Sequence, residues 1–211
     1  VDYGSLQYHD EFWTSDNTDA LQRIYMQYAT NLIYPPLATA SHVSASPGHQ
    51  TGIITPLKFR FDVAMSGRLG MELQPKNMSE TEKAFAREAI VNYKTHIREL
   101  VTRGDLYRLI SPYACTNNHA ANMLVSKDKS KAVLFAYCTG FNRRGVRPTV
   151  HLHGLDAAKH YRLTEINKIS PRKSFWGDGE VFDGEYLKEV GVELQIARQY
   201  ESAVFLIEEV K

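Results

Sequence analysis

Apolar residues recur every three or four positions in three stretches of the first half of the chain, which predicts three amphipathic helices. The three stripes are Leu21, Ile24, Tyr25, Tyr28 and Leu32; Leu57, Phe61 and Met65; and Phe85, Ala89, Tyr93, Ile97, Leu100 and Val101. Start signals precede them: Asp19, Pro56, and Ser79 with Glu82 as a capping box. Pro35-Pro36 ends the first helix and Gly104 the third.

A short apolar segment precedes each predicted helix, at residues 11–14, 40–45 and 69–73. Strands that alternate with helices indicate a parallel sheet, because each helix returns the chain to the same edge. The pattern therefore predicts three strand-helix units in the first half of the chain.

The pattern changes after Pro112. Short runs rich in apolar, aromatic and β-branched residues follow at 120–125, 131–137, 149–154, 160–166, 191–196 and 203–210. Such runs, separated by turn residues, predict an antiparallel β-sandwich. We place the boundary near Pro112, which gives an α/β part at 1–112 and an all-β part at 113–211.

Three strand-helix units do not close a barrel, which needs eight units and roughly 250 residues. Parallel strands are normally covered on both faces, so three units alone would leave exposed edges. We interpret the chain as the tail of a larger enzyme; a small independent α/β enzyme with an open sheet is the alternative. The chain starts at Val1 without an initiator Met, which fits a processed, cloned or proteolytic piece.

Composition and net charge argue against some classes of binding partner. Lys plus Arg is 25 and Asp plus Glu is 24, a net charge of +1, so no basic surface favours nucleic acid. No apolar run approaches the ~20 residues that cross a bilayer. We predict neither a nucleic acid nor a membrane partner, leave localisation open, and keep a homo-oligomer as an option.

The segment from Trp13 to Ala20, WTSDNTDA, carries the main candidate chemistry. Asp16 lies directly after a strand and before a helix, where α/β folds place reacting groups. Trp13 would supply a sugar-stacking face or an apolar pocket wall. The structural alternative is that the aspartate caps a helix and the tryptophan belongs to the core.

His151 and His153 are two residues apart on a predicted strand, a spacing that can bind Zn²⁺. No third ligand is obvious nearby, so we interpret the pair as a polar strand face and predict no metal.

The segment WTSDNTDA with the following LQRIYMQYATNLIYP resembles the acid/base region of glycoside hydrolase family 36, the alpha-galactosidases. Further blocks that resemble the family in the same order are residues 46–73, GLDAAKHYRLTEIN from Gly154, and GEYLKEVGVEL from Gly184. The resemblance covers nearly the whole chain.

The resemblance implies a retaining glycosidase that acts on terminal alpha-galactosyl residues of oligosaccharides, without a cofactor. It implies a fold of the α/β plus all-β class: the last three βα units of a (β/α)8 TIM barrel, followed by an antiparallel β-sandwich. Asp16 matches the family's general acid/base at the end of the sixth barrel strand, whereas Asp19 does not and would start the helix.

The chain departs from the family at the nucleophile. The family's nucleophilic aspartate lies in a Lys-Trp-Asp motif on the fourth strand, but Trp13 is followed by Thr14 and Trp176 by Gly177. The family's Cys- and Gly-rich substrate loop, expected just before Val1, is also absent. We therefore expect this piece alone to be inactive, with the missing N-terminal part of the same enzyme as its partner.

A non-catalytic carbohydrate-binding or structural β-sandwich module is the rival interpretation. A glycan-binding sandwich would expose aromatic side chains in a row, whereas a packing domain would bury them. The residues that decide this are Tyr137, Tyr161, Phe175 and Trp176.

Overall fold

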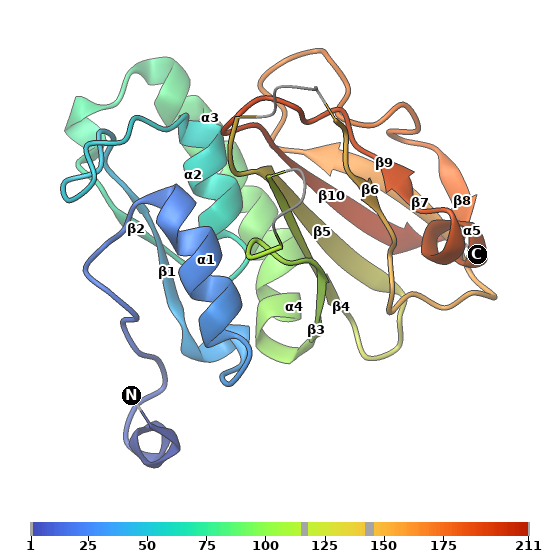
Figure 1. Ribbon diagram of the computed structural model, residues 1–211, viewed down its shortest axis with the longest axis horizontal. Helices are drawn as coiled ribbons and strands as arrows, with labels where there is room; N and C mark the ends of the chain where they lie inside the picture. The colour runs from blue at the N-terminus through green and yellow to red at the C-terminus, as the bar shows by residue number, and fades with distance from the viewer. Residues whose placement is uncertain (1, 115–117, 142–145, 211) are drawn as a thin grey trace.

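The computed structural model describes residues 2–114, 118–141 and 146–210. Its α/β part holds two strands and a set of helices, and its second part is mainly antiparallel sheet (Figure 1). The elements up to residue 103 are η1 (Tyr3–Gln7), α1 (Ala20–Thr30), η2 (Pro36–Ala38), β1 (Ala40–Ser44), α2 (Leu57–Ala64), β2 (Arg68–Glu72), η3 (Pro75–Asn77), α3 (Glu80–Asn92), the π-helical turn η4 (Tyr93–Ile97) and α4 (Arg98–Arg103).

β1 and β2 pair in parallel, with Ala40 opposite Arg68. A third extended segment joins them at Phe12, which forms a parallel bridge with Thr39. The predicted strands at 40–45 and 69–73 are confirmed within a residue or two, whereas the one at 11–14 is reduced to that single bridge. A closed barrel of eight units stays a prediction.

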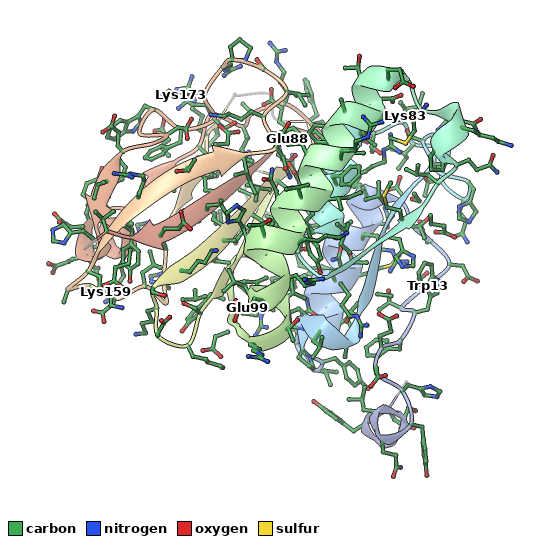
Figure 2. All side chains as sticks on the ribbon, turned by 180° about the vertical axis from the view of Figure 1, so that it is seen from behind. Trp13, Lys83, Glu88, Glu99, Lys159 and Lys173 are labelled. Carbon is green, nitrogen blue, oxygen red and sulfur yellow. The ribbon has the colours of Figure 1, made fainter. Side chains whose placement is uncertain are left out.

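The helices begin where the sequence predicts. Asp19 caps α1 by accepting hydrogen bonds from the backbone N–H groups of Leu21 and Gln22. Ser79 and Glu82 form the expected capping box of α3. α3, η4 and α4 follow one another without a break and form one long helix beside the antiparallel sheet (Figure 2).

The second part is built on a six-stranded sheet with the order β3-β4-β5-β10-β7-β8. Its elements are β3 (Asp105–Ile110), β4 (His119–Val125), β5 (Lys131–Cys138), β6 (Thr149–Val150), β7 (His160–Ile166), β8 (Val181–Asp183), α5 (Gly184–Glu189), β9 (Val192–Glu193) and β10 (Ser202–Glu209). All its pairings are antiparallel, as predicted, and β6 with β9 forms a further two-stranded antiparallel sheet. β3 pairs with β4, so the sheet includes residues 105–110, which lie before the expected boundary at Pro112.

The central strands β4, β5 and β10 are buried on both faces, because their side chains alternate between two cores. Val133, Phe135 and Tyr137 of β5 pack with the helices in one apolar cluster. Leu134 and Ala136 belong to a second cluster with residues of β6, β9 and their flanking loops. The α/β part therefore shares its core with the sheet, which argues against the alternative of a small independent α/β enzyme. No helix in the described ranges has the length and apolar character that a membrane crossing requires.

Candidate active site

The segment that carries Asp16 pairs with the start of β1 at Phe12 and continues in the direction of that strand. The backbone N–H of Phe12 donates to the Ala38 carbonyl at 2.9 Å, and that of Ala40 donates to the Phe12 carbonyl at 3.2 Å. These bonds align Phe12 with the start of β1, so the chain beyond it runs toward the ends of β1 and β2. Asp16 therefore follows a strand-like segment and precedes α1, as the sequence predicts.

A chain of short-range hydrogen bonds shapes the loop around Asp16. The Ser15 hydroxyl oxygen accepts from the Asn17 N–H at 3.1 Å, and the Asn17 side-chain oxygen accepts from the Asp19 N–H at 3.1 Å. Asp16 itself is exposed. Asp19 is only 5% exposed and is occupied as the helix cap and by the Thr51 hydroxyl, which donates to it at 3.2 Å. The two carboxylates thus differ in accessibility, and only Asp16 is open to a ligand.

Trp13 lies between side chains from two other elements. Its ring centroid is 4.5 Å from that of His42 on β1, and the Arg23 guanidinium carbon of α1 lies 5.1 Å from its centroid. Trp13 is half-buried. Figure 2 shows it on the side of the α/β part remote from the antiparallel sheet. The contacts with His42 and Arg23 fix the ring, and part of the side chain stays accessible.

His42 on β1 is the histidine that contacts this segment, through Trp13. Its register partner on β2 is Gly70, where an added Cβ would come within 2.1 Å of the imidazole. The His42 Nδ1 is buried and has no hydrogen-bond partner in the described part of the structure. Desolvation lowers the pKa of His42, opposed by Glu72 and assisted by the positive charge of Arg23.

Arg23 and Glu72 are the two charged residues of this site that the sequence reasoning missed. Arg23 is only 2% exposed, and burial lowers its pKa while Glu72 and Asp16 raise it. One signal was available: a basic residue in the first turn of a helix opposes the helix dipole. Glu72 ends β2 and is exposed. Glu72 and Asp16 are therefore the two carboxylates that act electrostatically on the Arg23 guanidinium.

The paired histidines lie elsewhere. His151 and His153 are exposed just after β6, their rings stack at a centroid distance of 6.1 Å, and His151 Nδ1 lies 3.2 Å from the Lys188 carbonyl. Within residues 2–114, 118–141 and 146–210, no group of three or more His, Cys, Asp or Glu side chains is placed to hold a metal ion.

Three of the four aromatic residues that a glycan-binding sandwich would expose are buried. Tyr137, Tyr161 and Phe175 are 2%, 0% and 1% exposed, whereas Trp176 is 61% exposed. The buried rings pack in the two cores of the sheet. A row of exposed aromatic side chains at these positions is therefore not formed, which weakens the rival interpretation of a carbohydrate-binding module.

Two family models match the chain: Melibiase over residues 1–104, and the glycosyl hydrolase family 36 C-terminal domain over residues 119–207. Alpha-galactosidase 2 of Hypocrea jecorina is 37% identical over 209 residues, which is 98% of this chain and 26% of that protein. Alpha-galactosidase AgaA of Geobacillus stearothermophilus is 42% identical over 162 residues, 77% of this chain and 22% of that protein. The chain thus spans about a quarter of the length of the curated relatives it matches.

Solved structures give the same match. The GH36 alpha-galactosidase AgaB of Geobacillus stearothermophilus superposes with a TM-score of 0.87 at 36% identity, covering 99% of this chain and 27% of that one. The galactosidase domain of the alpha-galactosidase-sucrose kinase AgaSK gives a TM-score of 0.86 at 34% identity, with 99% and 27% coverage. Variants of the Geobacillus stearothermophilus enzyme AgaA, similar over the same share, were crystallised in complex with raffinose and with stachyose.

Proposed function

This chain belongs to glycoside hydrolase family 36, and on that premise we propose that it is the C-terminal portion of a retaining alpha-galactosidase. Residues up to Arg103 would form the last three βα units of a (β/α)8 barrel, and the antiparallel part would pack against the outside of its helices. The parallel pairing of β1 with β2 and the parallel bridge at Phe12 support this arrangement.

Asp16 is the proposed general acid/base. It would protonate the glycosidic oxygen as the galactosyl group leaves, and then accept a proton from the water that hydrolyses the glycosyl-enzyme. The observation that carries this role is the contrast with Asp19: two carboxylates share one loop, and the exposed one is at the strand end. Trp13, held beside it, is proposed as a wall of the galactosyl pocket.

The nucleophile of a retaining site would come from another part of the parent enzyme. The two carboxyl groups of such a site lie ~5–5.5 Å apart, and the printed sequence has no Lys-Trp-Asp motif to supply the second. We infer that residues 1–211 alone do not hydrolyse galactosides. The substrates we propose are oligosaccharides with a terminal alpha-galactosyl residue, of the kind of raffinose and stachyose.

The sharpest test of the Asp16 role uses the parent enzyme with Asp16→Ala, an aryl alpha-galactoside and azide. An activated aryl leaving group needs little protonation, so the galactosyl-enzyme still forms, but water no longer loses its proton to a base. Azide then attacks the intermediate and should yield alpha-galactosyl azide, identified by NMR. On raffinose, whose leaving group is poor, we expect kcat/KM to fall about 10²- to 10⁴-fold.

Asp19→Asn is the matched control, because asparagine also caps helices well. It should leave kcat/KM on raffinose within a few-fold of the wild type. If Asp16→Ala gave beta-galactosyl azide instead, Asp16 would be the nucleophile. If Asp16→Ala lowered kcat/KM equally on raffinose and on the aryl substrate and gave no azide product, this result would contradict any proton-transfer role for Asp16.

A further inference from the structure

Arg23 places a buried guanidinium against the three residues that precede Asp16. Its Nη1 donates to the Thr14 hydroxyl oxygen, and its Nη2 donates to the Ser15 carbonyl at 2.7 Å. Its guanidinium carbon lies 5.1 Å from the centre of the Trp13 ring, in cation–π range. One side chain from the first turn of α1 therefore contacts every residue of the strand-end segment up to Asp16.

These contacts come at a cost to folding. Arg23 is 2% exposed, forms no ion pair with any carboxylate in the part of the chain that the structure describes, and has a buried Nε without a partner. Burying an unpaired cation is expensive, and a positive charge at a helix N-terminus opposes the dipole. Such local conflicts are expected where function, rather than stability, fixes a residue.

Beyond Asp16 the loop is fixed by other contacts, because the Ser44 hydroxyl donates to the Thr18 carbonyl at 2.7 Å and Asp19 caps α1. Before Asp16, the side-chain contacts at Thr14 and the Ser15 carbonyl come from Arg23. Residues 13–19 form no helix or strand, and the carboxylate of Asp16 is exposed. Burial lowers the pKa of Arg23, and the negative charges of Glu72 and Asp16 oppose that shift. A rigid guanidinium with two directional hydrogen bonds to Thr14 and Ser15 therefore sets the path of the backbone into Asp16.

We propose that Arg23 is a positioning residue: through Thr14, Ser15 and Trp13 it holds the Asp16 carboxyl group in line with the glycosidic oxygen. This inference rests on the proposed acid/base role of Asp16. Positioning matters most when a proton must reach a poor leaving group, because a misplacement of about 1 Å can cost about 10²-fold in rate.

The test compares two substrates in the parent enzyme with Arg23→Met, which keeps the length of the side chain and removes its charge and donors. We expect kcat/KM on raffinose to fall about 10²-fold, and kcat/KM on 4-nitrophenyl alpha-galactoside to change much less. Arg23→Lys, which retains the charge and a donor, should recover part of the loss on raffinose. The measured quantity is the ratio of the two kcat/KM values.

Arg60→Met is the matched control. Arg60 on α2 also has a buried Nε without a partner, and its Nη1 donates to the Ser44 carbonyl at the end of β1 at 2.6 Å. Its loss should disturb the same part of the molecule without changing the substrate ratio. If Arg23→Met lowered kcat/KM equally on both substrates, as we expect of Arg60→Met, Arg23 would be a structural residue and the inference would be overturned.

A milder variant covers the case in which Arg23→Met does not fold. Thr14→Val keeps the shape of the side chain and removes one acceptor of the guanidinium, so it should shift the substrate ratio in the same direction, by less. An unchanged ratio in a folded Thr14→Val enzyme overturns the inference. Asp16→Asn distinguishes failure of the positioning role of Arg23 from failure of the acid/base role of Asp16. If Asp16→Asn changes the substrate ratio but Arg23→Met and Thr14→Val do not, only the positioning role fails. If Asp16→Asn leaves the ratio unchanged, the proposed function fails.

Discussion

At the residue scale, His42 and Gly70 show how neighbouring strands make room for an imidazole. A side chain at position 70 would overlap the His42 ring, with Cβ only 2.1 Å from its Cδ2. The ring packs against Trp13 and has a buried Nδ1 without a partner in the described structure. A protonated imidazole would need both ring nitrogens to donate hydrogen bonds, so this environment favours the neutral form.

His42 should make the stability of the enzyme depend on pH. Desolvation lowers its folded-state pKa; Arg23 lowers it further, whereas Glu72 and Glu11 raise it. Because the unfolded state then binds the proton more readily, the free energy of unfolding should fall as pH drops below the ordinary histidine pKa of about 6.5. Urea unfolding at pH 7.5 and pH 5.5 measures this, and His42→Gln should reduce the difference. An identical pH dependence in both proteins would contradict the prediction.

The residues of the site were only partly predictable. The helix cap at Asp19 was predictable, because a helix start is a local pattern, whereas the role expected of Asp16 came from the family resemblance. The contacts of Arg23 with Thr14 and Trp13 could not be predicted, since they depend on how α1 packs back over the strand end. Glu72 lies in a strand that the sequence predicts beside β1, but nothing in the sequence indicates that its charge acts on His42 and Arg23.

At the scale of elements, the long helix contains a π-helical turn whose cause is visible in its sequence. Phe85, Ala89, Tyr93 and Ile97 recur in steps of four. Each step of four advances an apolar stripe by about 40° around a regular α-helix of 3.6 residues per turn. The wider turn η4 (Tyr93–Ile97) absorbs a residue and keeps Tyr93 and Ile97 buried with the earlier positions. The sequence predicted the helix but not this turn, because the count of apolar positions ignored the drift.

Tyr93 joins this helix to the start of β2. Its hydroxyl accepts from the Leu69 N–H at 3.1 Å and donates to the Gly67 carbonyl at 3.0 Å. Tyr93→Phe would leave both backbone groups without these partners and should lower the free energy of unfolding by about 1–3 kcal/mol. The midpoint of denaturant unfolding measures the loss. Tyr186→Phe, at an exposed position, is the control; equal effects of the two substitutions would show that the bonds contribute nothing.

At the scale of the whole molecule, a buried carboxylate connects the two parts. Asp62 on α2 is fully buried and pairs with Lys58 of the same helix. It also accepts from the Asn167 amide at 2.9 Å and from the Ser202 hydroxyl on β10 at 2.7 Å. The periodic pattern of α2 gave no sign of the bonds from Asn167 and Ser202, because these two donors lie more than 100 residues from Asp62 in the chain.

Asp62→Ala should destabilise the enzyme by about 3–5 kcal/mol, because it leaves a partly buried ammonium group and two side-chain donors without their acceptor. It should also separate the unfolding of the α/β part from that of the antiparallel sheet, which calorimetry would record as an additional transition. Asp183→Ala, which breaks the exposed pair with His160 at 2.9 Å, should cost only about 0–1 kcal/mol. A single unshifted transition in Asp62→Ala would rule out the connecting role.

The burial of both faces of the central strands has a consequence for protein engineering. One face of β5 completes the packing of the helices, and the other closes a separate apolar cluster. To transplant the antiparallel region onto a different hydrolase, the chain could not simply be cut near Pro112. The excised piece would expose to solvent the apolar face that packs against the helices. The graft would also need the apolar faces of α2 and of the long helix that pack on the sheet. The sheet and these helices would therefore have to be transferred together.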